Sequence, residues 1–208
     1  MSPATNNGEK DRQGSILKLA KRLGALKLGH YKLASGQTAQ YYFDGRLITL
    51  DPEGAHLVAQ ALMPILEKSG ADTVGGPAIA AVPMVTAIAQ LSFLQGHPIS
   101  GLIVRDEMKK HGTGKIIEGT LLPDSKVAII DDTCSTGSSL LHAINTIENA
   151  GGAVVVVACI LDRHMGGSDA IKAKGHEFFS LLEADEDGNI GTGYTCLLYT
   201  SPSPRDRG

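Results

Sequence analysis

Two adjacent carboxylates and a loop of small hydroxyl residues stand together near the middle of the chain. Four apolar residues, 127–130, have the pattern of a buried parallel strand, and Asp131 and Asp132 follow at once. Small residues come next, and apolar residues at helical spacing begin at Leu140. Ligands of open α/β sheets bind at the carboxyl ends of strands. There, loop and helix N–H groups can hold an anion, and carboxylates can accept hydrogen bonds from hydroxyls.

A plainer explanation of this stretch is an ordinary strand-to-helix turn with an N-cap serine and two carboxylates near a helix dipole. The full loop favours ligand binding. It is not a Walker loop, because no Gly-Lys-Ser/Thr follows the strand. The stretch resembles the phosphoribosyl-pyrophosphate signature of the type I phosphoribosyltransferases, in which such a loop cradles the 5-phosphate. The resemblance implies binding of phosphoribosyl pyrophosphate by Asp131, Asp132, Thr133, Cys134, Ser135, Thr136, Gly137, Ser138 and Ser139.

A tyrosine-rich segment near the amino terminus narrows the resemblance. Residues 29–36 read Gly-His-Tyr-Lys-Leu-Ala-Ser-Gly, and residues 41–44 read Tyr-Tyr-Phe-Asp. The pattern predicts two β segments around a turn, which could be a plain surface hairpin. It is similar to the hood of one branch of the family, the orotate phosphoribosyltransferases, where it forms a lid over the base. The resemblance implies that orotate is bound by Tyr42, Phe43, Ser135 and Arg163.

Arg163 follows a strand-like apolar run that ends in Asp162. A guanidinium binds a planar carboxylate through two parallel hydrogen bonds. The resemblance therefore implies that Arg163 binds the orotate carboxylate. The alternative is a surface ion pair between Arg163 and Asp162 or Asp169.

Residues 105–115 carry five basic or potentially basic side chains and two glycines. Composition alone favours a solvated charged loop. The segment is similar to the mobile family loop that closes over pyrophosphate, with matches at Arg105, Glu107, Lys109, His111 and Gly112. It implies pyrophosphate contacts from Arg105, Lys109 and His111, and a homodimer in which the loop reaches the neighbouring subunit's site. The implied catalytic residues are Lys109, His111, Asp131 and Asp132. Three residues stand where some members of the branch carry lysines: Ala34, Ala80 and Asp106.

The implied reaction joins orotate to phosphoribosyl pyrophosphate, giving orotidine 5-phosphate and pyrophosphate, a step of pyrimidine (UMP) synthesis. Mg²⁺ is the implied cofactor, bound mainly through substrate oxygens and water, with no direct protein ligand expected. Two alternatives stay open at this point. One is a phosphoribosyltransferase for another base, and the other is a non-catalytic regulator that senses phosphoribosyl pyrophosphate.

Composition limits the class of protein. The chain has 208 residues, 42% of them hydrophobic, which favours one packed domain. With a formal charge of −3, the chain lacks the excess of basic residues that is typical of proteins that bind nucleic acid. No apolar run is long enough to cross a membrane, and no secretory signal is evident. The three scattered cysteines have no metal-binding spacing and favour a reducing compartment, so we expect a cytoplasmic protein.

The expected organisation is an α/β fold of the type I phosphoribosyltransferase kind, with a mostly parallel central sheet flanked by helices and a small amino-terminal hood. We expect a polar, loose extension over residues 1–13 and the domain over 14–193, with the hood at about 26–46. Residues 194–208 lose hydrophobic periodicity, look like translated vector sequence and are expected to lie outside the fold. The expected helices are 15–23, 52–68, 82–94 and 138–149, and the expected strands are 73–75, 99–104, 127–130, 154–161 and 176–182.

Overall fold

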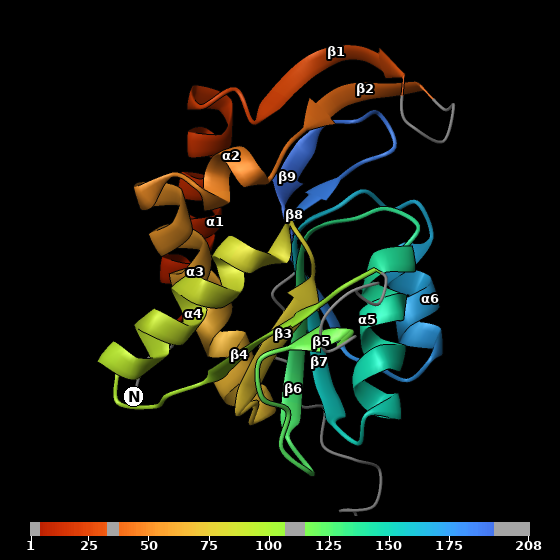
Figure 1. The fold of residues 1–208 in the computed structure, drawn as a ribbon. Coiled ribbons are helices and arrows are strands. Elements are labelled where there is room, and N and C mark those ends of the chain that lie inside the picture. Colours follow the sequence, from red (N-terminus) through yellow and green to blue (C-terminus); the bar gives the residue numbers. More distant parts are fainter. Residues whose placement is uncertain (1–4, 33–37, 107–114, 194–208) are drawn as a thin grey trace, which may run out of the picture.

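The computed structural model describes residues 5–32, 38–106 and 115–193. Within these residues, seven strands form a central sheet in the order β5-β4-β3-β6-β7-β8-β9, and β1 and β2 form a separate hairpin (Figure 1). Neighbouring strands from β4 to β8 run parallel, and β5 and β9 are antiparallel edges. This confirms the predicted mostly parallel sheet. The sheet strands are β3 (Thr73–Pro77), β4 (Ser100–Val104), β5 (Ile117–Glu118), β6 (Lys126–Cys134), β7 (Ala153–Asp162), β8 (Phe178–Ala184) and β9 (Ile190–Thr192).

Helices cover both faces of the sheet (Figure 1). Four lie on one side: α1 (Thr5–Arg22), α2 (Arg46–Thr49), α3 (Pro52–Ser69) and α4 (Ala81–Leu94). Two lie on the other: α5 (Ser138–Asn149) and α6 (Gly167–Ala173). No helix within the described ranges combines the length and the apolar character needed to cross a membrane.

The central strand β6 is buried on both faces, as its unbroken apolar run predicts. Ala128 and Ile130 pack in the core with α3 and α4, while Val127 and Ile129 pack in a second core with α5. The strand therefore enters the site between two packed layers. Its carboxyl end has little freedom to move.

Two helix boundaries follow from capping. The Asp51 carboxylate accepts a hydrogen bond from the Gly54 N–H at 3.0 Å, and Pro52 occupies the first turn of α3. Gly70 ends that helix with φ 71° in the left-handed region. The bounds of α5 coincide with the predicted helix.

Several boundaries differ from the prediction. β6 and β7 continue to Cys134 and Asp162, because their parallel pairing persists as far as the pair formed by these two residues. Asp131 and Asp132 therefore lie within the strand rather than in a turn after it. The first helix begins at Thr5 rather than Ser15, so the expectation of a loose terminus over this stretch was wrong. The stretch 5–14 carries no apolar residue, so no hydrophobic period could reveal it.

The hood is an antiparallel hairpin of β1 (Leu26–Lys32) and β2 (Thr38–Phe43), as predicted. It stands above the carboxyl end of the sheet, close to β9 (Figure 1). Ala34 and the turn between the two strands lie outside the described residues. The hood is anchored by Tyr41 and Phe43, whose side chains are buried in the main core. It is thus attached at the end where open sheets bind ligands.

Candidate active site

The carboxyl end of β6 and the start of α5 enclose a pocket of about 270 Å³, which we call the phosphate-loop pocket. The loop between them places Gly137 at φ 77°, which brings the chain round to the first turn of α5. Residues 77–80, the turn between β3 and α4, close the opposite side. The pocket is lined by Pro77, Ala78, Ala80, Asp106, Asp131, Asp132, Thr133, Ser135, Thr136, Gly137, Ser138, Ser139 and Leu140.

Of the residues predicted to bind phosphoribosyl pyrophosphate, nine form the stretch 131–139, and eight of these nine line this pocket. The exception is Cys134, whose side chain is 1% exposed and packs in the core under α5 and α6. Burial raises the pKa of its thiol to about 12, so the thiol stays protonated. The side chain of Cys134 therefore supports the loop from below instead of facing a ligand.

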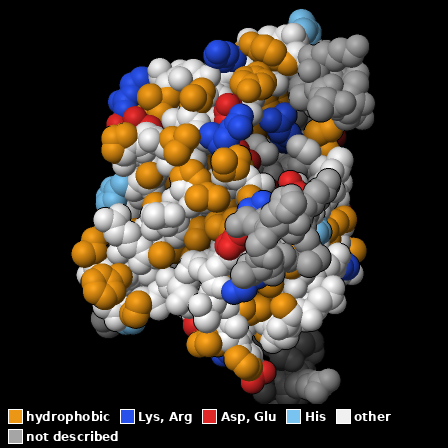
Figure 2. Space-filling view, viewed as in Figure 1, with side chains coloured by type: hydrophobic (Ala, Val, Ile, Leu, Met, Phe, Trp, Pro, Cys, Tyr) orange, Lys and Arg blue, Asp and Glu red, His pale blue; other side chains and the backbone are white. Residues whose placement is uncertain are grey.

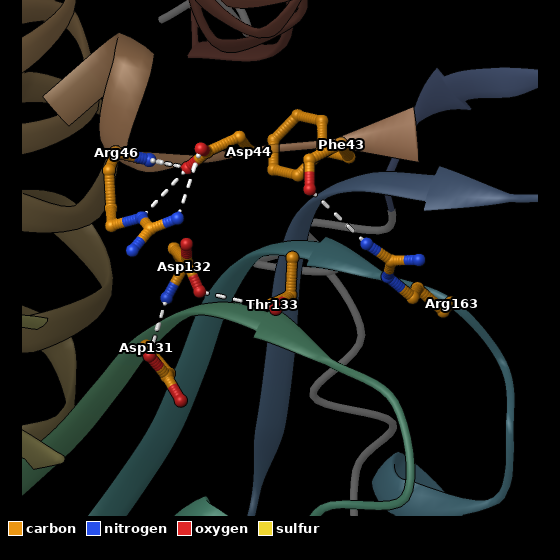
Figure 3. A network of polar contacts seen from close by, with 7 residues as sticks. All are labelled: Phe43, Asp44, Arg46, Asp131, Asp132, Thr133 and Arg163. Carbon is orange, nitrogen blue, oxygen red and sulfur yellow. Dashed lines mark hydrogen bonds and ion pairs between the residues drawn. The ribbon is translucent and has the colours of Figure 1, made fainter. Parts of the chain in front are cut away.

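The charged forms of Asp131 and Asp132 are disfavoured in the free site. The Asp131 carboxylate accepts a hydrogen bond from the Asp132 N–H at 2.8 Å, and the Asp132 carboxylate accepts one from the Thr133 hydroxyl at 3.1 Å (Figure 3). Burial, and then the charge of Asp132, raise the pKa of Asp131 to about 8. The pKa of Asp132 is also raised, chiefly by burial. A ligand whose hydroxyl groups donate hydrogen bonds, or one that brings positive charge, would stabilise the charged forms of both carboxylates and lower their pKa values.

The segment directly after β2 lies against Asp132. The sequence did not predict this contact. Arg46 donates from Nε and Nη2 to the two oxygens of Asp44, at 2.9 and 3.1 Å, and this ion pair lies beside Asp132 (Figure 3). The hydrogen bonds from Arg46 lower the pKa of the Asp44 carboxyl. Between them, Gly45 packs so closely that an added Cβ would lie 2.6 Å from the Asp132 Cβ. The available signal was the Asp-Gly-Arg sequence directly after a strand.

Arg163 follows β7 and turns toward the hood. Its Nη2 donates to the Phe43 carbonyl oxygen at 3.3 Å (Figure 3). Its guanidinium carbon lies 5.3 Å from the centre of the Tyr41 ring. Asp162 instead accepts a hydrogen bond from the His164 N–H at 2.9 Å. Among the described residues no ion pair joins Arg163 to Asp162 or Asp169, so the alternative interpretation of Arg163 lacks support.

The structure brings only part of the predicted orotate set together. Arg163 and the Phe43 main chain are in contact, whereas Tyr42 is partly exposed, with its ring 5.7 Å from that of Tyr31. Ser135 belongs to the phosphate-loop pocket. Arg163 lines a separate, larger cavity under the hood. Tyr41, which contacts Arg163, was not singled out in the sequence, because a buried ring in a strand looks like any core residue.

The basic loop is described only at its base. Arg105 N–H donates to the Ile116 carbonyl at 2.9 Å, and the Arg105 carbonyl lies 3.0 Å from His142 Nε2 of α5. Arg105 itself lines a neighbouring pocket that shares Ala78 and Asp106 with the phosphate-loop pocket. The other predicted loop residues lie outside the described residues: Glu107, Lys109, His111 and Gly112. Ala80 and Asp106, two of the positions that differ from lysine-bearing relatives, do line the phosphate-loop pocket.

Comparisons with known proteins agree with this arrangement. A family model described as the phosphoribosyl transferase domain matches residues 48–186. The chain is 39% identical over 162 residues to an orotate phosphoribosyltransferase of Rhodopseudomonas palustris (strain BisB18), covering 76% of this chain and 87% of that protein.

Solved structures agree as well. The orotate phosphoribosyltransferase of Mycobacterium tuberculosis H37Rv in complex with Fe(III) dicitrate superposes with a TM-score of 0.72 at 33% identity, covering 83% of this chain and 96% of that one. The same enzyme in complex with 5-phospho-alpha-D-ribosyl 1-diphosphate gives a TM-score of 0.68 at 30% identity, with the same coverage. The chain therefore belongs to the phosphoribosyltransferase family and, within it, to the orotate phosphoribosyltransferases.

Proposed function

We propose that this protein transfers the 5-phosphoribosyl group of phosphoribosyl pyrophosphate to orotate, in the cytoplasm, as a step of pyrimidine synthesis. One arrangement carries the proposal. The carboxylate pair and the small-residue loop share a pocket at the end of β6, and Arg163, directly after the adjacent strand β7, contacts the hood backbone. The first group suits a ribose phosphate, and the second suits a planar carboxylate.

In this reaction the bond between ribose C1 and the pyrophosphate oxygen breaks, and its electron pair leaves with pyrophosphate. Orotate N1 bonds to C1, and the proton of N1 passes to solvent water. Asp131 and Asp132 orient the ribose by accepting hydrogen bonds from its hydroxyls, and the loop N–H groups hold the 5-phosphate. Arg163 exchanges the Phe43 carbonyl for the orotate carboxylate. The protein contributes positioning and a preorganised electrostatic environment rather than a covalent intermediate.

The residues present fit Mg²⁺ bound mainly by substrate. Asp131 and Asp132 offer hard carboxylate oxygens, and the described residues hold no group of three potential metal ligands. Mg²⁺ would take its oxygen ligands mainly from pyrophosphate, ribose hydroxyls and water, and Asp131 and Asp132 would accept hydrogen bonds from those hydroxyls. When bound, Mg²⁺ supplies positive charge that neutralises the leaving pyrophosphate.

A homodimer with a shared site is part of the proposal. Several large apolar side chains of the α4 region are about 70% exposed, including Ile79, Phe93 and Leu94. Figure 2 shows hydrophobic side chains at the lower left of the viewed face, where Figure 1 places the end of α4. A second copy would cover such side chains. Lys109 and His111 would then act on the neighbouring subunit's pyrophosphate.

The dimer proposal has a complementation test. A subunit carrying Lys109→Ala and His111→Ala is refolded together with one carrying Asp131→Asn and Asp132→Asn. Random pairing makes about half the dimers mixed, and each mixed dimer holds one complete site, so about a quarter of wild-type activity should return. No gain over either mutant alone, with mixed dimers demonstrated, would contradict action in trans.

The activity itself is tested by the loss of orotate absorbance with phosphoribosyl pyrophosphate and Mg²⁺. Parallel reactions contain adenine, hypoxanthine or uracil in place of orotate. Turnover should occur with orotate and should require phosphoribosyl pyrophosphate. Turnover with another base alone would replace the proposed substrate. Binding of phosphoribosyl pyrophosphate without any turnover would favour a sensing role.

A further inference from the structure

The connection from β7 to α6, taken with the first residue of α6 as residues 163–167, runs beside the phosphate loop, residues 135–137 (Figure 1). We call residues 163–167 the strap. Two backbone hydrogen bonds join it to the end of β6 and the start of the loop. The Arg163 N–H donates to the Cys134 carbonyl, and the Gly167 N–H donates to the Ser135 carbonyl, both at 2.9 Å. The strap therefore begins at the guanidinium next to the hood and ends on the phosphate loop.

The contact at Gly167 leaves no room for a side chain. A Cβ added there would lie 2.5 Å from the Gly137 nitrogen, 2.5 Å from the Ser135 carbonyl oxygen and 2.7 Å from the Cys134 sulfur. Two of these three atoms are backbone, so they cannot rotate away. Gly167 has no positive φ. The requirement for glycine at this position is therefore one of space and not of backbone conformation.

The phosphate loop cannot yield in the direction of the core. Behind the contact, Cys134, Ser168 and Ile171 are all buried, and Leu140 packs in the same core. Protein cores are packed at crystal density, so a displaced loop moves toward open space. The open space here is the pocket that Gly137 and Ser135 line.

We propose that Gly167 is a positioning residue for the 5-phosphate cradle, which it holds from behind through backbone contact. The identity of the ligand rests on the proposed function. A methyl group at position 167 would push the Gly137 backbone toward the pocket that this residue lines, and so change the shape of the cradle. Displacements of an ångström or less in such cradles cost on the order of tenfold to a hundredfold.

The test compares Gly167→Ala with Gly14→Ala. Gly14 lies in α1, has nothing within 4 Å of an added Cβ and has no positive φ, so it controls for loss of a glycine. Steady-state kinetics are measured with each substrate varied, and orotidine 5-phosphate binding is measured by calorimetry. Gly167→Ala should raise KM for phosphoribosyl pyrophosphate about tenfold or more and weaken orotidine 5-phosphate similarly. The orotate KM and kcat should change less than about threefold, and Gly14→Ala should match wild type.

Two results would overturn the proposal. One is a Gly167→Ala enzyme that binds both 5-phosphate ligands as Gly14→Ala does. The other is a parallel loss for orotate and the 5-phosphate ligands, which would indicate general disruption. The proposed function can fail separately. A wild-type protein without orotate turnover would contradict that function. Calorimetry with phosphoribosyl pyrophosphate would still test the role of Gly167.

A second variant keeps the test decisive if Gly167→Ala folds poorly. Cys134→Ala combined with Gly167→Ala removes the sulfur from the crowded contact but leaves both backbone contacts. The double variant should melt higher than Gly167→Ala and should still bind phosphoribosyl pyrophosphate more weakly than Cys134→Ala alone. Equal affinity of these two folded proteins would overturn the proposal.

Discussion

The two ends of the active site are built in different ways. The phosphate end comes from one continuous segment, β6 with its loop and α5, whose strand lies between two packed cores and ends in the buried Asp131 and the half-buried Asp132. The base end joins Arg163 to Phe43, which are 120 residues apart, through one hydrogen bond of 3.3 Å and a ring contact with Tyr41. One end depends on local chain geometry and the other on long-range packing.

The difference extends to charge and mobility. At the phosphate end, burial raises the pKa of Asp131 and Asp132, so the free site holds strained acidic groups. The base end offers a cation held by a two-stranded hairpin, and such hairpins are marginally stable alone. The hood is held mainly by the burial of Tyr41 and Phe43. We therefore expect substitutions at the phosphate end to cause large losses of activity. Substitutions at the base end should cause smaller losses, because the hairpin can shift to accommodate them.

The largest expected effect is at the phosphate end. Asp131→Asn combined with Asp132→Asn removes both charged acceptors for the ribose hydroxyls while keeping the side-chain shape. Loss of one preorganised polar contact costs about 10²–10³-fold, so kcat/KM should fall by at least about 10³-fold with the fold intact. Circular dichroism and melting curves check the fold beside the orotate assay. Near-normal turnover in the double mutant would remove the carboxylate pair from the mechanism.

A smaller, substrate-selective effect is expected at the base end. Arg163→Ala removes a charge-assisted hydrogen bond, of about 1.5–3 kcal/mol, so the orotate KM should rise roughly 10- to 150-fold. KM for phosphoribosyl pyrophosphate should change little. Arg163→Lys keeps the charge without the planar fork and should recover only part of the loss. If the orotate KM is unchanged in Arg163→Ala, the base end as described does not bind orotate.

The same contrast explains what the sequence could reveal. The apolar run 127–130 and the helical spacing after Ser138 are local signals, and they located β6, α5 and nearly every pocket residue of that end. The strand was predicted too short, because a carboxylate inside a strand has no hydrophobic period. The role of Cys134 differed because a residue in a loop motif can still point into the core.

The base end was reached only through the resemblance to a family. Nothing local links Arg163 to Phe43, and nothing marks Tyr41 as the ring under a guanidinium. The close approaches of Gly45 to Asp132 and of Gly167 to the phosphate loop were missed for the same reason. Such contacts form between elements that are distant in the sequence, and the hydrophobic periodicity of one element carries no information about them.

The support of Arg163 by Tyr41 gives a sharper test of the base end. Tyr41→Leu keeps an apolar side chain but removes the ring, and cation–π contacts contribute about 0.5–1 kcal/mol or more, so the orotate KM should rise about two- to fivefold. Tyr41→Phe keeps the ring and should match wild type. The readout is the orotate KM at saturating phosphoribosyl pyrophosphate. Equal values for the two variants would show that Arg163 does not depend on the ring.

The smallest expected effect concerns the stability of the free protein and returns to the phosphate end. Burial raises the pKa of Asp131 from 3.8 to about 8, so between these values the folded protein holds a proton that the unfolded chain has lost. Folding then takes up a proton. The stability contributed by this group is therefore fully present below about pH 4 and is lost as the pH rises toward 8. The slope for one proton is at most about 1.4 kcal/mol per pH unit.

Asp131→Asn cannot titrate, so its melting temperature should gain on that of wild type as the pH rises from 5 to 8. Each kcal/mol corresponds to about 2–4 °C in a chain of this size. Other groups titrate in both proteins, so the difference between the two melting curves isolates Asp131. The matched control is Asp185→Asn: hydrogen bonds from Asn189 lower the pKa of Asp185, so this group is ionised in both the folded and the unfolded protein from pH 5 to 8, and the difference between this variant and wild type should stay constant. A difference between wild type and Asp131→Asn that stays constant across this pH range would mean that Asp131 is ionised in the free enzyme, and the strained acidic character of the phosphate end would then be wrong.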